Sequence, residues 1–167
     1  VKDDYKEQLE QLLSDESMSR FQNLVAIGEI GLDLYWDDTY INYQIEAFAC
    51  QLSYASERNL PVIIHCRNAF PQIMDVMRGF RNQNLKGLFH CFSDDYESAA
   101  KVLDLGFYIG VGGVLTYKKS LLPEVVSKVP LESILLETDS PYLAPVPFRG
   151  KRNEASFVSY VATRLAE

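Results

Sequence analysis

The residues best suited to chemistry are two histidines and two carboxylates, each placed where a short apolar run gives way to polar residues. His65 and His90 are the only histidines, and each follows an apolar run and precedes a cysteine. Glu29 and Asp139 lie near the ends of two further apolar runs. Imidazole and carboxylate groups that meet at one edge of a sheet suit a divalent metal. A lone buried histidine is more often a core residue, but two in equivalent positions beside two carboxylates favour a metal site.

Two interpretations of Glu29 remain open at this point. It lies between Gly28 and Gly31, which permit close backbone approach and unusual dihedral angles. It is either a metal ligand or a surface residue on a strand bulge, and we favour the ligand because the surrounding run is too apolar to be exposed. Asp33, two residues beyond Gly31, either supports the metal ligands or caps a helix.

Asp139 follows the apolar run at 134–136 in a stretch that ends in Ser140 and Pro141. Proline cannot donate to a sheet ladder, so it ends the strand. Side chains alternate along a strand, so Glu137 and Asp139 are expected to share one face. A carboxylate at the end of a buried strand is costly unless a cation meets it, and we expect a metal ion to meet Asp139.

Two arginines are candidates for contacts with substrate phosphate. Arg67 follows His65 by two residues and so shares its face, where a guanidinium suits phosphate or carboxylate; the alternative is a surface ion pair. Arg149 opens a run with three cations at 149–152 in an otherwise acidic chain, and the alternative is a solvated loop. Cys66 and Cys91 are expected to point away from the preceding histidines and to act as small buried hydrophobic residues.

The hydrophobic pattern predicts strands that alternate with helices along the whole chain. Alternation of this kind predicts an α/β fold with a parallel sheet, either open or part of a barrel. The carboxyl ends of such strands form the active face in both architectures. The predicted strands cover residues 24–32, 61–66, 87–92, 107–114 and 134–137. The predicted helices cover residues 2–14, 41–58, 69–82, 93–105, 121–129 and 153–167.

Length and composition narrow the class of protein. With 167 residues, of which 47% are hydrophobic, the chain is expected to form one domain over residues 1–167. Its net charge of −7 argues against a broad basic nucleic-acid surface, although bound divalent cations would reverse the local sign. Three cysteines without a CxxC pair predict reduced thiols in an intracellular, cytoplasmic protein. No apolar run approaches the ~18 residues that span a membrane.

Five motifs, in order along the chain, resemble the TatD family of metal-dependent hydrolases within the amidohydrolase superfamily. They are spread over nearly the whole chain, and the five together are far more specific than any one of them. The matching segments are AIGEIGLDLYWD (26–37), PVIIHCRNA (61–69), GLFHCFS (87–93), GVGGVLTYKK (110–119) and LLETDSPYLAPVPFRGKRNE (135–154).

The resemblance implies a TIM-type (β/α)8 barrel with a dinuclear metal site. By this resemblance Glu29 bridges the two ions, His65 and His90 hold the second ion, and Asp139 holds the first and lies near the attacking water. Family members are described as magnesium-dependent deoxyribonucleases, several with 3′→5′ exonuclease activity, and manganese or zinc is also seen. The implied substrate is therefore DNA, with RNA as an alternative, and catalysis is expected to depend on Glu29 and Asp139.

The chain also departs from the family pattern. The family begins with a strand that carries a His-x-His pair, which this chain lacks, and a full barrel has eight strands where we count five. Together with the start at Val1 rather than Met, this predicts an N-terminally incomplete barrel. Two other functions stay open: an amidohydrolase acting on a C–N or ester bond of a small molecule, and a non-catalytic binding module. The oligomeric state is not predicted.

Overall fold

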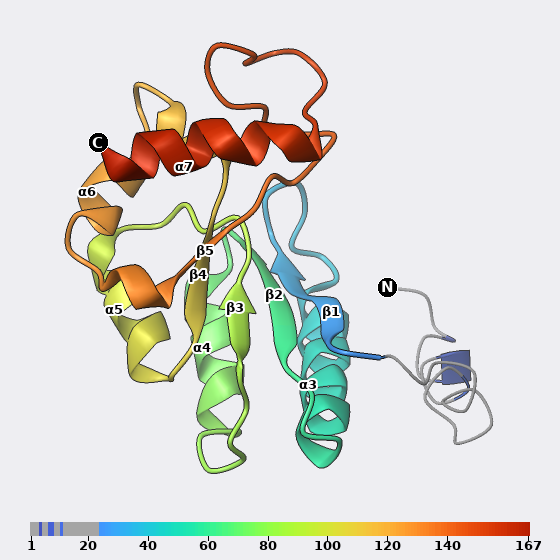
Figure 1. Cartoon of the computed structure of the whole chain (residues 1–167). Coiled ribbons are helices and arrows are strands. Elements are labelled where there is room, and N and C mark those ends of the chain that lie inside the picture. Colours follow the sequence, from blue (N-terminus) through green and yellow to red (C-terminus); the bar gives the residue numbers. More distant parts are fainter. Residues whose placement is uncertain (1–3, 5–6, 9–10, 12–23) are drawn as a thin grey trace. The chain divides into compact units, whose positions relative to one another are not determined.

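The computed structural model describes residues 4, 7, 8, 11 and 24–167 (Figure 1). The helix predicted over residues 2–14 therefore lies largely outside the described residues. The chain divides into two compact units, Val1–Lys86 and Gly87–Glu167, and each is described by itself.

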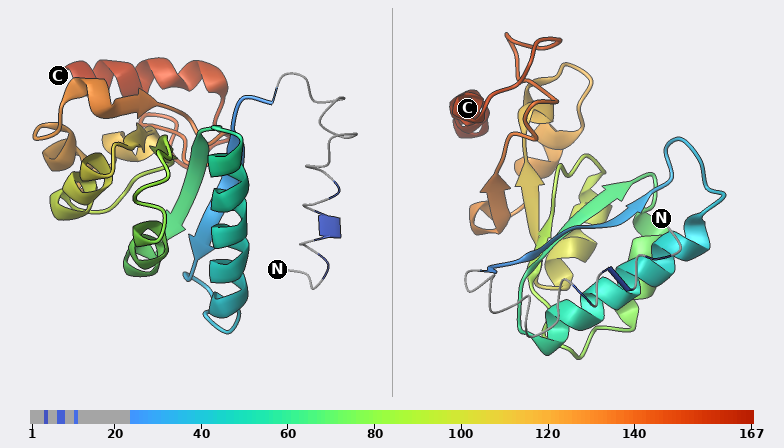
Figure 2. Two further views of the ribbon diagram at one scale, coloured as in Figure 1. Left: turned by 90° about the horizontal axis from the view of Figure 1, so that it is seen from below. Right: turned by 90° about the vertical axis from the view of Figure 1, so that its right-hand side faces the viewer.

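The first unit pairs two parallel strands and places a helix after each of them. Helix α3 lies along the strand pair in both views of Figure 2. Its residues Phe48, Leu52 and Ala55, spaced three or four apart, are fully buried and form the apolar stripe of an amphipathic helix. The elements are β1 (Ile27–Asp33), α3 (Ile41–Glu57), β2 (Val62–Arg67) and α4 (Phe70–Arg78).

Strand β1 carries a bulge at Glu29. Gly28 pairs with Ile63 and Ile30 pairs with Ile64, so Glu29 has no partner in the ladder. An unpaired extra residue re-aims its side chain, and 49% of the Glu29 side chain is exposed. The expectation that the apolar run buries Glu29 is wrong, and the bulge is confirmed.

The second unit continues the alternation with three parallel strands in the order β3, β4, β5. Helix α7 packs against β5 and against the 3₁₀ turn η1. The elements are β3 (Gly87–Phe89), α5 (Tyr96–Asp104), β4 (Tyr108–Val111), η1 (Gly113–Thr116), α6 (Leu122–Val126), η2 (Leu131–Ser133), β5 (Ile134–Leu136), η3 (Ala155–Phe157) and α7 (Val158–Ala166).

Several boundaries in the second unit differ from the prediction. Strand β3 ends at Phe89, so His90 and Cys91 belong to a turn in which Cys91 has φ +46°. Helix α5 begins at Tyr96, later than the predicted residue 93, and Asp95 caps it by accepting from the Ser98 amide at 2.9 Å. Gly106, with φ +77°, follows the end of this helix, where a left-handed backbone favours glycine.

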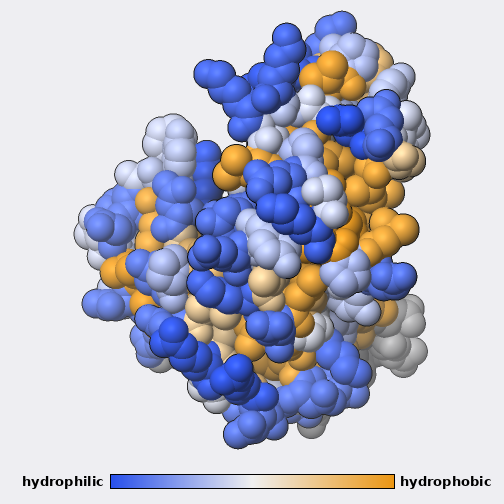
Figure 3. All heavy atoms as spheres, turned by 90° about the vertical axis from the view of Figure 1, so that its left-hand side faces the viewer, coloured by the Kyte–Doolittle hydropathy of each residue, from blue (hydrophilic) through white to orange (hydrophobic). Residues whose placement is uncertain are grey.

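Both units have parallel strands followed by helices, which confirms the α/β class. Among the described residues, no helix is long and apolar enough to cross a membrane. On the face drawn in Figure 3, hydrophilic residues cover most of the surface and hydrophobic ones lie between them.

Candidate active site

In the first unit, His65 lies between two carboxylates. Its Nδ1 atom is 3.3 Å from Oε2 of Glu29, and its Nε2 atom is 3.1 Å from Oδ2 of Asp33. The bulge in β1 delivers Glu29, while Gly31 pairs directly with His65 across the ladder. A Cβ atom at Gly31 would collide with the His65 carbonyl oxygen, so only glycine allows the two strands to approach this closely.

Asp33 supports His65 and does not cap helix α3, which begins after Tyr40 without a side-chain cap. Burial raises the pKa of Asp33. Hydrogen bonds from the Tyr35 amide and from His65, with the charges of His65 and Arg67, outweigh burial and bring the pKa below its usual range. The Asp33 backbone is fixed as well, because Gln44 accepts from its amide at 2.9 Å and donates to its carbonyl at 3.2 Å. Asp33 is therefore a carboxylate anion fixed beside Nε2 of the His65 imidazole.

Arg67 lies on the same side of the first unit as this cluster. Its guanidinium stacks on the Tyr35 ring, 3.7 Å from the centroid, and Nη1 is 3.9 Å from Oδ2 of Asp33. About half of the side chain is exposed. The ring and the carboxylate orient the guanidinium, and its exposed part can still contact an anion.

A cavity of about 590 Å³ joins the cluster to aromatic side chains of the loop after β1. Glu29, Asp33 and His65 line it together with Trp36 and Tyr40. Trp36 is 83% exposed, which is unusual for so large an apolar side chain. Sequence reasoning missed Trp36 and Tyr40. The available signal was an aromatic run between the Glu29 motif and the next helix.

In the second unit, His90, Cys91 and Asp139 come together, with one potential ligand atom of each within 4.8 Å of the others. The prediction that Cys91 points away from His90 is wrong. The strand ends at Phe89, so the alternation of side chains no longer applies at the turn that follows. Asp139 is also outside its strand, with φ +55°, in the loop that follows β5.

Glu137 organises this second cluster. Its Oε1 atom accepts a short hydrogen bond from the Cys91 amide, and its Oε2 atom lies 3.4 Å from Nδ1 of His90. Gly110 leaves the space that the Glu137 carboxylate fills, because a Cβ at Gly110 would lie 2.5 Å from Oε1. Glu137 thus holds both the histidine ring and the turn that carries Cys91.

The loop with Asp139 is fastened by Asn153, the one buried polar residue recorded in the described part of the chain, at 2% exposure. Its Nδ2 donates to the carbonyl oxygens of Thr138 and Tyr142, each at 2.6 Å. These two carbonyls flank Asp139, so the Asn153 amide fixes the backbone on either side of Asp139. Sequence reasoning did not identify Asn153, whose only signal was its place in the last motif.

Arg149 belongs to the second unit and stacks on Tyr117, with its guanidinium carbon 4.4 Å from the ring centroid. The structure thus places Glu29, His65 and Arg67 together in the first unit. It places His90 and Asp139 together in the second unit, which also carries Arg149.

The donor atoms in the two clusters fit divalent metals. Carboxylate oxygen and imidazole nitrogen are ligands shared by Mn²⁺ and Zn²⁺, and carboxylate oxygen suits Mg²⁺. The carboxylates of Asp33 and Glu137, each beside a histidine nitrogen, match the way proteins orient metal-binding imidazoles.

Comparison with known proteins gives the same family from sequence and from structure. The family model described as "TatD related DNase" matches residues 1–167. The chain is 42% identical over 153 residues to the uncharacterized metal-dependent hydrolase YabD of Bacillus subtilis, covering 91% of this chain and 60% of that protein. It is 42% identical over 146 residues to the uncharacterized metal-dependent hydrolase YcfH of Escherichia coli K12, covering 87% of this chain and 55% of that protein.

The crystal structure of YjjV, a TatD homologue from Escherichia coli K12, superimposes with a TM-score of 0.89 at 35% identity, covering 99% of this chain and 62% of that one. The chain thus spans about 60% of the length of the relatives that it matches. The likeness to YjjV confirms the TIM-barrel type of α/β fold. With the family model matched over its whole length, the chain belongs to the TatD-related DNase family.

Proposed function

We propose that this chain carries metal-binding and catalytic residues of a divalent-metal-dependent hydrolase that cleaves phosphodiester bonds of DNA, in the manner of a 3′→5′ exonuclease. The observation that supports it most is the pairing of each histidine with carboxylates. Glu29 and Asp33 meet His65 in one unit, and Asp139 meets His90 in the other. Two hydrolases of this family share 42% identity with the chain.

In this proposal Glu29, His65, His90 and Asp139 hold the metal ions. Two ions are expected, with Mg²⁺ the first candidate and Mn²⁺ or Zn²⁺ the alternatives. When bound, such ions lower the pKa of water to near neutrality and stabilise the charge that develops at phosphorus. Asp139 is proposed to orient the attacking water and to accept its proton. Asn153 supports this role by fixing the loop that carries Asp139, through its hydrogen bonds to the carbonyls of Thr138 and Tyr142.

The supporting residues give these ligands fixed orientations. Asp33 accepts from Nε2 of His65, which leaves Nδ1 toward Glu29 with a lone pair to offer. Glu137 orients the His90 ring from its Nδ1 side and also fixes the turn at Cys91. Arg67 and Arg149, each stacked on a tyrosine ring, are proposed to contact substrate phosphates.

The substrate class is tested by offering the purified chain three substrates with Mg²⁺, Mn²⁺ or Zn²⁺: a 5′-labelled single-stranded DNA, the matching RNA, and a small amide. Stepwise shortening of the DNA from its 3′ end is the expected result, with Glu29→Gln abolishing it. Glu57→Gln, which removes an exposed carboxylate that is ion-paired with Arg58, is the control. Cleavage of the amide with no attack on either nucleic acid would support the amidohydrolase alternative and contradict the proposal.

A further inference from the structure

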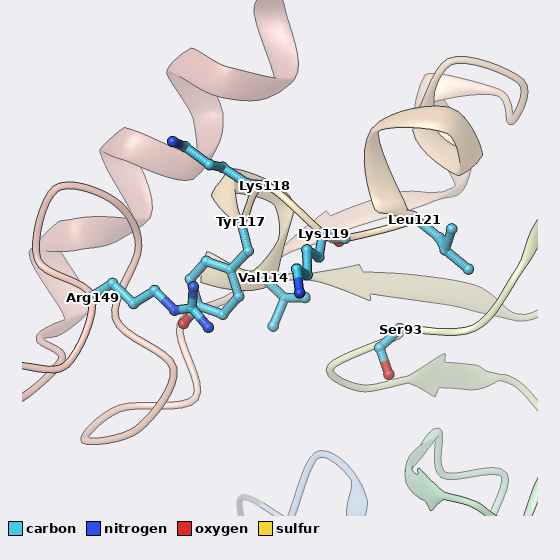
Figure 4. A pocket seen from close by; sticks show the side chains of 8 residues that line it. Ser93, Val114, Tyr117, Lys118, Lys119, Leu121 and Arg149 are labelled. Atoms are coloured by element: carbon cyan, nitrogen blue, oxygen red, sulfur yellow. The ribbon is translucent and has the colours of Figure 1, made fainter.

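The second unit contains a cavity of about 630 Å³ that carries positive charge and no carboxylate. This volume is typical of a site for a small molecule or for one segment of a polymer. Figure 4 shows the Arg149 side chain against Tyr117, and Lys119 on the side of the cavity that faces Ser93. The lining residues are Ser93, Val114, Tyr117, Lys118, Lys119, Ser120, Leu121 and Arg149.

The cations that line this cavity are Lys118, Lys119 and Arg149. Within the part of the chain that the structure describes, no ion pair is recorded for Lys119 or Arg149, whereas Lys128 pairs with Glu124 at 2.6 Å. The whole sequence has a net charge of −7, so an uncompensated pair of cations is a local exception. Two such cations give the cavity a local positive potential, and this potential attracts an anionic ligand.

Arg149 is oriented before any ligand arrives. Its guanidinium lies over the Tyr117 ring, and the Tyr117 hydroxyl donates to the Ala144 carbonyl at 3.0 Å. The ring is therefore anchored at its far end and serves as a fixed platform. A planar guanidinium held in this way presents its N–H donors as a fork that matches phosphate oxygens.

The cavity lies near the His90 cluster. Burial raises the pKa of Tyr117, the charge of Arg149 lowers it, and the Cys91 side chain raises it further. Ser93 lines the cavity two residues after Cys91 along the chain. An anion bound here therefore neighbours the residues proposed to hold metal and water.

We propose that this cavity binds a phosphate group of the substrate strand other than the one being cleaved, with Lys119, Arg149 and the Ser93 hydroxyl as its contacts. The inference rests on the proposed function, and it adds a second point of attachment for the nucleic acid. A strand held at two phosphates is fixed in direction as well as in position.

Two kinds of phosphate have this chemistry. An internal diester carries one negative charge, and a terminal monoester carries about −1.5 to −2. Two cations and a hydroxyl can bind either the internal diester or the terminal monoester. Single-stranded oligonucleotides of one sequence, made with and without terminal phosphates, separate the two sources, because only a terminal site distinguishes them.

The experiment measures binding of these internally labelled oligonucleotides to the full chain by fluorescence anisotropy, in EDTA and over a range of salt concentrations. Lys119→Gln and Arg149→Gln are each expected to weaken binding by up to about fivefold at low salt. Removal of one cation that binds a phosphate should make the slope of log affinity against log salt about 0.7 less negative. Lys119→Arg should keep both affinity and slope.

Matched controls remove one positive charge elsewhere in the same unit. Lys101→Gln, on helix α5, should bind like the wild type. Lys118→Gln should weaken binding less than Lys119→Gln, because the Lys118 side chain points away from Lys119 in Figure 4. Equally weakened binding in Lys119→Gln and Lys101→Gln, or wild-type binding in the Lys119→Gln/Arg149→Gln double variant, would overturn the proposal.

The outcome does not depend on hydrolysis, because EDTA removes the metal. A protein that fails to cleave DNA but binds it through Lys119 and Arg149 would contradict the proposed function and support the cavity. If the wild type cleaves DNA and the double variant binds DNA with wild-type affinity, the proposed function is supported and the cavity proposal is contradicted.

Discussion

The Nε2 atom of His65 lies 3.1 Å from Oδ2 of Asp33, on the opposite side of the ring from the nitrogen that faces Glu29. A carboxylate in this position fixes the tautomer and the orientation of an imidazole that binds metal. Asp33 is itself tied to its neighbours, so it can hold the ring without moving.

Asp33→Asn is therefore expected to weaken metal binding in the first unit by about 10- to 100-fold while leaving the fold intact. Titration with Mn²⁺ by calorimetry measures the effect. Asp75→Asn is the control, because Asp75 lies on helix α4 of the same unit and forms an exposed ion pair with Arg78 at 2.6 Å. Equal affinities for the two variants would show that Asp33 does not support a metal ligand.

Trp36 is a fluorescent probe of the cavity of about 590 Å³ in the first unit, which it lines together with Glu29 and His65. It is the only tryptophan in the sequence. Co²⁺, which quenches indole fluorescence at short range, is expected to lower the emission of the wild type in a saturable way. Glu29→Gln should shift this titration to higher Co²⁺, and Glu57→Gln should not. Unsaturable quenching that is identical in all three proteins would mean that no ion binds at Glu29.

The parts of this molecule that were predictable from sequence are those governed by local periodicity. Helix α3 shows its buried stripe at Phe48, Leu52 and Ala55, and the alternation of strands and helices identifies the α/β class. The histidine and carboxylate positions also followed from where apolar runs end. Periodicity stops being informative once a strand ends.

That limit explains the errors at Glu29 and Cys91. A bulge removes Glu29 from the alternation, and the turn after Phe89 turns Cys91 toward His90. Both depend on long-range partners, His65 in one case and Glu137 in the other. Asn153 was missed for the same reason, because its two acceptors lie 15 and 11 residues earlier in the chain.

The thiol of Cys91 gives the second cluster a donor that favours soft metals. Thiolate selects Zn²⁺ over Mg²⁺ and Mn²⁺, so Cys91→Ser is expected to lower the affinity for Zn²⁺ by a larger factor than the affinity for Mn²⁺. Competition with a chromogenic chelator measures both affinities. Cys50→Ser, on helix α3, is the control. A uniform decrease for both metals would indicate that Cys91 only shapes the turn.

Helix α5 supplies a prediction about pH. The pKa of Asp95 is lowered from 3.8 by its hydrogen bonds with Ser98. The folded state therefore favours the charged carboxylate more than the unfolded chain does, so the cap stabilises the fold above pH 3.8 and loses this effect as pH falls through the lower, folded-state pKa.

Asp95→Ala is thus expected to lower the melting temperature at pH 7, and the difference from wild type should shrink as pH falls below 3.8. Thermal melts followed by circular dichroism test this. Asp104→Ala, at the other end of the same helix, should not lower the melting temperature at pH 7, since an acid near a helix carboxyl end is not stabilising. A difference between wild type and Asp95→Ala that is constant with pH would rule out the charged cap.

The central claim, that Asp139 serves metal-dependent hydrolysis of DNA, is tested most directly by the initial rate of nucleotide release from the 3′ end of single-stranded DNA. The rate is measured with Mn²⁺ for the wild type, for Asp139→Asn and for the exposed control Glu132→Gln, and again for the wild type in EDTA. We predict release by the wild type and by Glu132→Gln, none in EDTA, and a decrease of about 10²- to 10⁴-fold in Asp139→Asn, the range expected when a positioned base is removed. Release at the wild-type rate by Asp139→Asn, or in EDTA, would contradict the account.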